Sequence, residues 1–323
     1  MRILKLESIQ HNKHSITSKY SIDQFSFKTI IHLDKNINLF NLKNIYGHKQ
    51  IDNILFHISA LDMNKIISLK PDNIDFNSEF DTDSFRLFYS KLFDKIWAEW
   101  RYKHNIEYNI NYLSESHKKN NLKIKRKNSS KTLTFIGGGK DSLLTINLLK
   151  SHNIETDYFQ GAFSFYGDLH EQHNMISLIN KNSNHLKFSV TEDFLDSNIL
   201  DHYLEINHLT AGETPYTMFI SLLYMLQNNY FYGILGHEKS ADVGNLIWKN
   251  EEINHQWGKS TEAEAIYNKY INKNILDCCF FSLLKPINDT FIFNLLNDFG
   301  DNIEFAHSCN IKKPWCGECP KCA

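Results

Sequence analysis

The sequence predicts an α/β fold whose main part is a parallel sheet covered by helices. From Thr132 onward, short apolar segments alternate with amphipathic ones, which is the pattern of repeated strand–helix units. Three consecutive glycines join the first expected strand to the first expected helix, and a long polar segment follows a later strand. Ligands of such sheets bind at the carboxyl ends of the strands, so we expect these segments to line one crevice.

The expected elements of this part follow one another in strict alternation. Strands are predicted at residues 132–136, 156–163, 185–190, 231–235 and 280–284, and helices at 142–152, 170–180, 215–227, 262–270 and 289–298.

A smaller N-terminal α+β domain is predicted before this part. Residues 20–33 read as a strand or hairpin, and residues 52–64 and 83–102 as helices. The end of the second helix, W-A-E-W-R-Y at 97–102, is either a packed helix end or a substrate platform. A polar, basic linker at 114–131 separates the regions. We therefore predict an N-terminal domain at 1–125 with possible substrate contacts, a catalytic domain at 126–305 and a C-terminal metal knuckle at 306–323.

Charge and hydropathy exclude several classes of function. The 323 residues include 35 Lys and Arg against 37 Asp and Glu, a balance that makes a nucleic-acid partner unlikely on charge grounds. No apolar run reaches membrane-spanning length, and the first residues lack the apolar core of a signal peptide. A cytoplasmic location without membrane contact is therefore expected.

The glycine turn is suited to an anion. Gly137, Gly138 and Gly139 expose backbone amides, and Asp141 and Ser142 open the following helix, whose positive end favours phosphate. The spacing fits neither the G-x-x-x-x-G-K-[ST] loop of common ATPases nor the G-x-G-x-x-G of dinucleotide sites.

The run G-G-G-K-D-S resembles the S-G-G-x-D-S signature of the PP-loop ATP pyrophosphatases, which have the adenine nucleotide α-hydrolase-like fold. The resemblance implies cleavage of ATP to AMP and pyrophosphate, with adenylation of a substrate oxygen. The departure is Gly137, where most members carry Ser. The resemblance also implies a cofactor site in which the three glycines and Ser142 hold pyrophosphate, Asp141 helps to place Mg²⁺ and Lys140 offsets phosphate charge.

Four cysteines crowd the last fifteen residues with the spacing C-x6-C-x2-C-x2-C. Four thiolates with two C-x-x-C turns suit a tetrahedral structural Zn²⁺, with free or redox-active thiols as the alternative. 7-Cyano-7-deazaguanine synthase, a PP-loop enzyme, is similar in carrying a C-terminal four-cysteine zinc knuckle. The expected ligands are Cys309, Cys316, Cys319 and Cys322.

The polar segment at 236–259 is predicted to be an active-site loop, because it is too long and too polar to be core. Its candidates for catalytic, metal and substrate roles are Glu238, Asp242, His255 and Lys259, which join Lys140 and Asp141 in the predicted catalytic set.

Several motifs together resemble the ATP-dependent UDP-N-acetylmuramoyl-L-alanyl-L-glutamate epimerase family. They are G-G-G-K-D-S, L-T-A-G-E-T-P-Y, G-H-E-K-S-A-D-V-G-N, N-H-Q-W-G-K-S and the terminal W-C-G-E-C-P-K-C. The resemblance implies an isomerase of cell wall biogenesis that adenylates the terminal glutamate of a peptidoglycan precursor and epimerises it from L to D. Its substrate would be a UDP-linked muramoyl dipeptide. Glu213 and His237 depart from the family pattern beside the expected site.

Two alternatives stay open. One is a PP-loop amidation or thiolation enzyme related to 7-cyano-7-deazaguanine synthase, and the other is a nucleotide-binding module without turnover. The sequence does not predict an oligomeric state.

Overall fold

The computed structural model describes residues 1–117, 121–127, 129–194, 212–299, 302–309 and 315–319. The chain forms two compact units, each assembled from separate segments. The first unit comprises Met1–Lys127, Val190–Asn228 and Ala241–Asp277, and the second Asn128–Ser189, Asn229–Ser240 and Cys278–Ala323. The division into domains at residues 125 and 305 stays a prediction.

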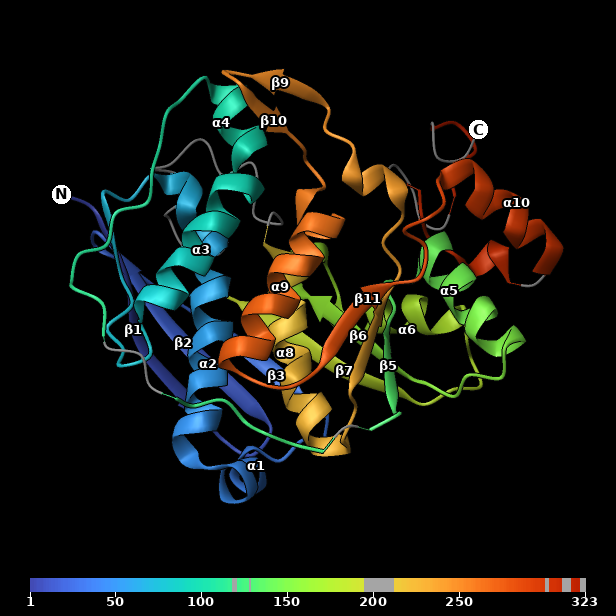
Figure 1. Ribbon diagram of the computed structural model, residues 1–323, viewed down its shortest axis with the longest axis horizontal. Helices are drawn as coiled ribbons and strands as arrows, with labels where there is room; N and C mark the ends of the chain where they lie inside the picture. Colours follow the sequence, from blue (N-terminus) through green and yellow to red (C-terminus); the bar gives the residue numbers. More distant parts are fainter. Residues whose placement is uncertain (118–120, 128, 195–211, 300–301, 310–314, 320–323) are drawn as a thin grey trace. The chain divides into compact units, whose positions relative to one another are not determined.

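The second unit is a sheet of mainly parallel strands with helices packed on it (Figure 1). Its strands lie in the order β11-β8-β5-β6-β7, and the pairs β11–β8, β8–β5 and β5–β6 are parallel. The strands are β5 (Thr132–Phe135), β6 (Asp157–Phe163), β7 (His185–Glu192), β8 (Tyr232–Leu235) and β11 (Cys279–Ser282). The last three residues of β7 belong to the first unit.

The helices of this unit bury one face each against the sheet or a neighbouring helix. They are α5 (Lys140–Ser151), α6 (Leu169–Leu178) and α10 (Asp289–Phe299), with short 3-10 turns at Ser164–Tyr166 and Ile303–Phe305. Helix α5 packs against α10 through a core that includes Leu143, Leu144 and Ile292, all fully buried. Apolar residues at helical spacing thus hold α5 in place, with its N-terminus directly after β5.

The first unit contains an antiparallel three-stranded sheet with a fourth, parallel strand, in the order β3-β2-β1-β4. The strands are β1 (Ile3–His11), β2 (Ser15–Ile22), β3 (Phe25–Leu33) and β4 (Asn73–Asp75), and a separate hairpin consists of β9 (Leu246–Trp248) and β10 (Glu251–Ile253). The helices are α1 (Leu39–Tyr46), α2 (His48–Asp62), α3 (Asp83–Ile96), α4 (Ala98–His104), α8 (Glu213–Asn228) and α9 (Thr261–Asn274), with 3-10 turns at Met63–Leu69 and Trp257–Lys259. A further 3-10 turn, Lys239–Asp242, begins in the second unit, and its last two residues belong to the first.

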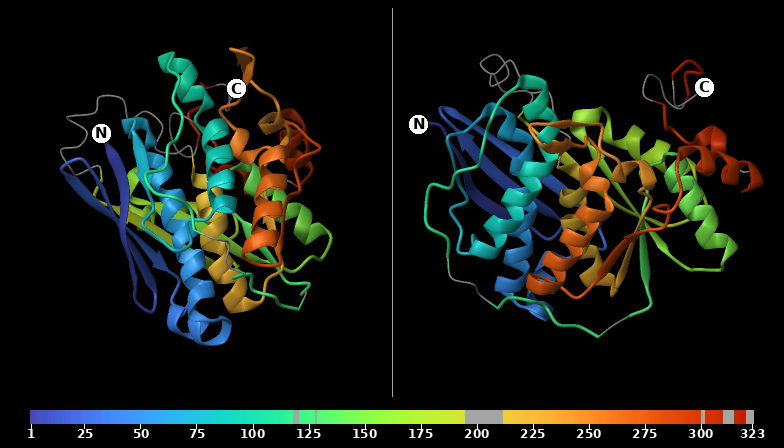
Figure 2. Two further views of the ribbon diagram at one scale, coloured as in Figure 1. Left: turned by 60° about the vertical axis from the view of Figure 1, so that its left-hand side comes forward. Right: turned by 45° about the horizontal axis from the view of Figure 1, so that its top comes forward.

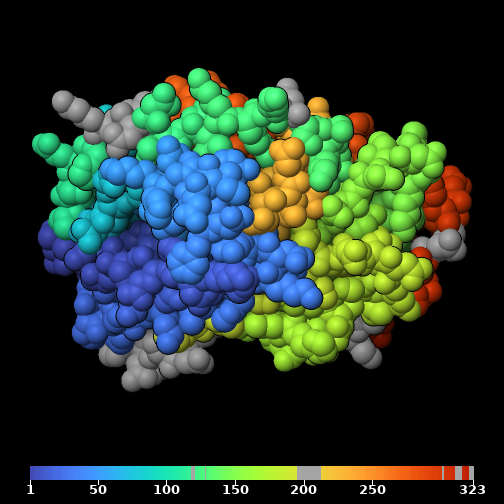
Figure 3. Space-filling view, turned by 90° about the horizontal axis from the view of Figure 1, so that it is seen from below, coloured from blue at the N-terminus to red at the C-terminus, as the bar shows by residue number. Residues whose placement is uncertain are grey.

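Helix α2 packs against both α1 and α8. The three antiparallel strands, in dark blue, lie side by side in both views of Figure 2. In the space-filling view the N-terminal residues, in blue, form a continuous surface (Figure 3).

The predicted elements agree with this structure to within a few residues at most ends. The predicted strand or hairpin at 20–33 is a hairpin, β2–β3. The five helices predicted from residue 142 onward are α5, α6, α8, α9 and α10, of which α8 and α9 belong to the first unit. The single helix predicted at 83–102 is interrupted at Trp97, whose φ of −94° and ψ of 5° leave the helical region. Within the described residues, no helix has both the length and the apolar character needed to span a membrane.

Candidate functional site

The glycine turn lies between β5 and α5 and is shaped by contacts with a distant segment. Gly138 has a φ of +79°, and a Cβ there would overlap the ring of His307. Only glycine therefore fits at this position. Gly139 precedes α5 and has no side chain to cap it, and the amide of Lys140 donates instead to Ser308 Oγ over 2.7 Å. The Gly137 amide donates to Ser142 Oγ over 2.9 Å.

A buried lysine between two carboxylates lies at the start of α5. Lys140 Nζ donates to Asp141 Oδ1 over 2.5 Å and to Asp289 Oδ1 over 2.7 Å. The Lys140 side chain is 3% exposed, while those of Asp141 and Asp289 are 37% and 49% exposed. The lysine thus lies beneath two carboxylates that reach solvent.

The charges of this cluster oppose one another. Burial disfavours the Lys140 ammonium, but attraction to Asp141 and Asp289 outweighs it, so the pKa of Lys140 is raised. Burial also raises the pKa of Asp141, with further contributions from the like charges of Asp289 and Glu238, although Lys140 opposes the shift. A cation brought to this side would relieve the repulsion among the carboxylates.

The segment after β8 reaches the same place. A Cβ on Gly236 would lie 3.4 Å from the Asp141 carbonyl oxygen. Glu238 is 8% exposed, and both its oxygens accept hydrogen bonds from Ser240, one from the amide at 2.7 Å and one from the hydroxyl. The structure therefore brings together the glycine turn and the start of the predicted polar loop, as expected for the adjacent parallel strands β5 and β8.

The other predicted loop residues, Asp242, His255 and Lys259, belong to the first unit. Asp242 accepts from Thr261 twice, from its amide over 2.5 Å and its hydroxyl over 2.7 Å. His255 Nδ1 lies 2.7 Å from Asn245 Oδ1, and Lys259 ends a 3-10 turn. In the motif at 209–216, Leu209, Thr210 and Ala211 lie outside the described residues.

The helix end at 97–102 is packed within the first unit. Trp97 and Trp100 are at most 1% exposed, and Arg101 Nη2 lies 3.0 Å from both carboxylate oxygens of Glu251 in β10. The two tryptophan rings meet edge to face. These contacts support the packed-end interpretation of this segment over the substrate platform.

Three cysteines are arranged as metal ligands would be. The sulfur atoms of Cys309, Cys316 and Cys319 all lie within 4.8 Å of one another, and those of Cys309 and Cys319 are 3.8 Å apart. Zn–S bonds of about 2.3 Å in a tetrahedron place sulfur atoms about 3.8 Å apart, so the spacing fits zinc. Gly317, at φ +78°, allows the tight turn in which Cys316 Sγ accepts from the amides of Glu318 and Cys319. The fourth expected ligand, Cys322, lies outside the described residues.

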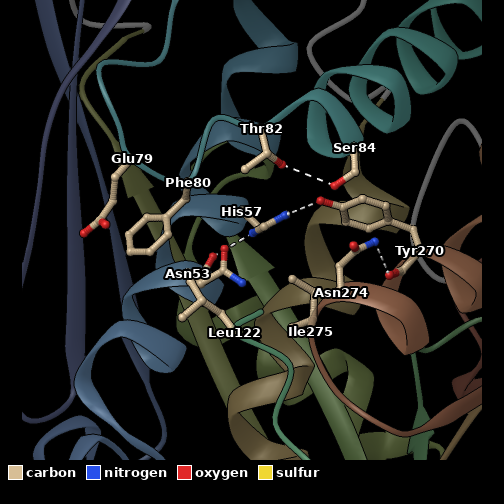
Figure 4. Close-up of a pocket in the computed structure, with 10 residues that line it drawn as sticks. All are labelled: Asn53, His57, Glu79, Phe80, Thr82, Ser84, Leu122, Tyr270, Asn274 and Ile275. Atoms are coloured by element: carbon tan, nitrogen blue, oxygen red, sulfur yellow. Dashed lines mark hydrogen bonds between the residues drawn. The ribbon is translucent and has the colours of Figure 1, made fainter. Parts of the chain in front are cut away.

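A pocket in the first unit contains none of the predicted site residues among the described residues that line it (Figure 4). Its volume of about 20 Å³ accommodates about one water molecule. At its base, His57 Nδ1 donates to the Asn53 carbonyl over 2.6 Å, so Nε2 accepts from the Tyr270 hydroxyl at 2.7 Å. Burial lowers the pKa of His57 to about 4, which keeps the ring neutral. This pocket is too small for a nucleotide.

Sequence reasoning missed Asp289, His307 and Ser308. Each reaches the glycine turn from well over a hundred residues away along the chain, at 149 residues for Asp289 with Lys140 and 168 for Ser308 with Lys140. The only local signal is that Asp289 is an acidic residue at a helix start, which is common without any function.

Comparison with known proteins gives a consistent result. A relative from Micromonospora sp., named UDP-N-acetyl-alpha-D-muramoyl-L-alanyl-L-glutamate epimerase, is 27% identical over 201 residues, which cover 59% of this chain and 42% of the relative. Relatives of the same name from Salinispora tropica and Xanthomonas oryzae pv. oryzae are also 27% identical, with 41% and 42% of their lengths covered. The match thus spans less than half the length of these relatives. The profile of the MurL N-terminal domain matches residues 3–283, and the chain therefore belongs to the MurL N-terminal domain family.

Proposed function

We propose that this chain binds Mg-ATP and takes part in the ATP-dependent epimerisation of the terminal glutamate of UDP-N-acetylmuramoyl-L-alanyl-L-glutamate. The family and the shared name of the relatives support the substrate and the epimerisation. The single observation that carries the ATP dependence is the Lys140 cluster, a buried ammonium beneath two solvent-reaching carboxylates at a glycine turn. In this proposal the chain is an isomerase with a PP-loop.

The residues present fit a magnesium nucleotide. Backbone amides of the turn and the start of α5 would contact phosphate oxygens, and the raised pKa of Lys140 keeps its ammonium charged beside them. Asp141 and Asp289 use Oδ1 for Lys140, and carboxylate oxygens are the ligands that Mg²⁺ prefers. Bound Mg²⁺ would neutralise phosphate charge and orient the polyphosphate.

Adenylation of the terminal glutamate would make its α C–H more acidic. The α C–H of a glutamate carboxylate is a poor acid, because deprotonation places two negative charges together. Attack of a carboxylate oxygen on the α-phosphorus of ATP expels pyrophosphate and leaves a neutralised, electron-withdrawing acyl group. A base can then remove the α proton, and return of a proton on the opposite face inverts the carbon. Water cleaves the acyl phosphate bond to give AMP and the epimerised acid.

In this proposal the polar-loop candidates supply the base. Asp242 and Glu238 each accept two hydrogen bonds from a nearby hydroxyl residue, Thr261 and Ser240 respectively, so these contacts do not separate them. Glu238 is close enough to raise the pKa of Asp141 and is buried, which suits a role beside the phosphates. We keep Glu238, Asp242, His255 and Lys259 as candidates for the proton transfers.

The test is to incubate the protein with Mg-ATP and UDP-N-acetylmuramoyl-L-alanyl-L-glutamate in D₂O without ammonia. We expect AMP, pyrophosphate and deuterium at the glutamate α carbon. Lys140→Met should lower AMP formation by about a hundredfold or more. Lys150→Met is the matched control on the same helix, because Lys150 lies in its last turn and donates to Asn180, and it should retain activity. Formation of ADP and phosphate, or a requirement for ammonia, would contradict the proposal.

We also propose that the C-terminal cysteines hold one structural Zn²⁺, with Cys322 as fourth ligand. Four thiolates would leave no open coordination position, so the metal would stabilise the fold rather than react. Metal analysis of the same preparation should find one zinc per chain. A native protein without zinc or iron would contradict this assignment.

A further inference from the structure

We propose that Ser308 is a nucleotide-binding residue, whose hydroxyl donates a hydrogen bond to a phosphate of the nucleotide at the start of α5. This inference rests on the proposed ATP site and adds a residue that lies outside the glycine turn, directly before the cysteine cluster. The turn itself carries no side chain at Gly137, Gly138 or Gly139.

Two consecutive residues hold the C-terminal segment against the turn. The His307 amide donates to the Gly138 carbonyl over 3.0 Å, and Ser308 Oγ accepts from the Lys140 amide over 2.7 Å. A Cβ on Gly139 would lie 3.0 Å from Ser308 Oγ, so the hydroxyl occupies the place of a capping side chain on that glycine. Cys309, the next residue, is 1% exposed, so the side chain that follows the hydroxyl is buried.

The chemistry of a hydroxyl makes this position useful. A serine hydroxyl can accept from the Lys140 amide and still donate its own proton. Phosphate oxygens accept hydrogen bonds only, and the start of a helix is where a phosphate binds. Ser308 therefore offers one directed donor among the glycines, beside the ammonium of Lys140.

A purely structural cap would behave differently from a phosphate ligand. Loss of a cap destabilises α5 but leaves the affinity for ATP unchanged in the folded protein. Loss of a hydrogen bond to a charged group weakens binding as well. Affinity and stability therefore separate the two roles.

The experiment measures Mg-ATP binding by calorimetry to the full chain, without the muramoyl substrate. Ser308→Ala should weaken ATP binding by about 10- to 100-fold, the usual effect of a hydrogen bond to a charged group. Ser308→Thr, which keeps the hydroxyl, should restore most of the affinity. Ser151→Ala is the matched control, because it removes a hydroxyl at the far end of α5, where Ser151 donates to Leu148. Thermal unfolding without ATP verifies that each variant is folded.

The outcomes distinguish this inference from the proposed function. If the wild-type protein binds ATP and Ser308→Ala binds it equally well, Ser308 is only a cap and the inference is wrong. Tighter binding by Ser308→Ala would show that the hydroxyl competes with phosphate, which also overturns it. If the wild-type protein binds no ATP, the proposed function fails and the inference fails with it.

Discussion

Two lysines of this chain are each held between two carboxylates, and their surroundings differ. In the first unit, Lys65 Nζ lies 3.0 Å from Asp62 Oδ1, contacts Glu192 and donates to Thr29 Oγ1 over 2.8 Å. In the second unit, Lys140 bridges Asp141 and Asp289. The ammonium is buried in both, with 8% of the Lys65 side chain exposed and 3% of that of Lys140.

The two clusters differ in how far their carboxylates are exposed to solvent. Those of Asp62 and Glu192 are 5% and 9% exposed, and Asp62 accepts a further bond from the Tyr20 hydroxyl at 2.8 Å. Those of Asp141 and Asp289 are 37% and 49% exposed. We call the Lys65 cluster closed, because the protein itself satisfies its charges. We call the Lys140 cluster open, because its carboxylates can still bind a ligand. Exposure of the anionic partners, rather than the presence of a buried ion pair, therefore favours Lys140 as the functional lysine.

The largest expected effect is on catalysis at the open cluster. Asp141→Asn removes a charge that we assign to Mg²⁺, so AMP formation should fall by about a hundredfold or more. The matched control is Asp168→Asn, because Asp168 caps α6 by accepting from the Glu171 amide and asparagine caps equally well. Product analysis of the two variants under identical conditions provides the measurement. If Asp141→Asn formed AMP as fast as the wild type, the assignment of a catalytic function to the Lys140 cluster would be wrong.

The next effect is on stability at the closed cluster. Lys65→Met leaves Asp62 and Glu192 buried beside each other without a cation, so the free energy of unfolding should fall by about 3 to 5 kcal/mol. Lys49→Met removes an exposed ion pair with Glu79, 2.7 Å long, and should cost about 0 to 1 kcal/mol. Chemical denaturation measures both. A Lys65→Met protein as stable as the control would show that the closed cluster is not structurally required.

Local sequence patterns predicted the second unit well and parts of the first poorly. Short apolar strands and amphipathic helices in alternation predicted β5, α5, β6 and α6, because burial of one face determines these elements. Strand β1 was not predicted. Its register shifts between Leu6 and Ser8, so the alternation of inward and outward residues breaks along the strand.

The site was predictable only where its residues are neighbours in sequence. The glycine turn, Lys140 and Asp141 are consecutive, so their joint role could be inferred from the motif. Asp289 and Ser308 join them through folding of distant segments, and no local pattern marks that contact. Asp242 shows that a polar loop residue can also have a structural contact. It accepts two hydrogen bonds from Thr261, the first residue of α9.

The smallest predicted effect is on the pH dependence of stability and concerns His57. This side chain is buried like Lys65, but its contacts are with uncharged groups. His57 is 2% exposed. Its ring contacts the Asn53 carbonyl, the Tyr270 hydroxyl, the stacked ring of Phe219 and the edge-to-face rings of Phe56 and Phe85. Glu79 also lines the pocket, but it is paired with Lys49 at 2.7 Å. Burial alone therefore dominates, and it lowers the pKa of His57 to about 4 from the ordinary 6.5.

Because the pKa of His57 is lower in the folded chain than in the unfolded chain, protonation of this histidine favours unfolding. Below pH 6.5 the unfolded chain binds a proton at this position and the folded chain does not, so stability falls until pH 4 and then levels off. Between pH 7.5 and pH 5 this group should contribute a loss of about 2 kcal/mol. The pKa of His173 is also lowered to about 4, by burial and by the nearby charges of Lys187, His170 and His185, so His173 changes stability in the same direction in the second unit. Denaturation at both pH values should therefore show a smaller pH-dependent loss in His57→Gln than in the wild type, by about 2 kcal/mol, and an unchanged loss would mean that His57 is charged in the fold.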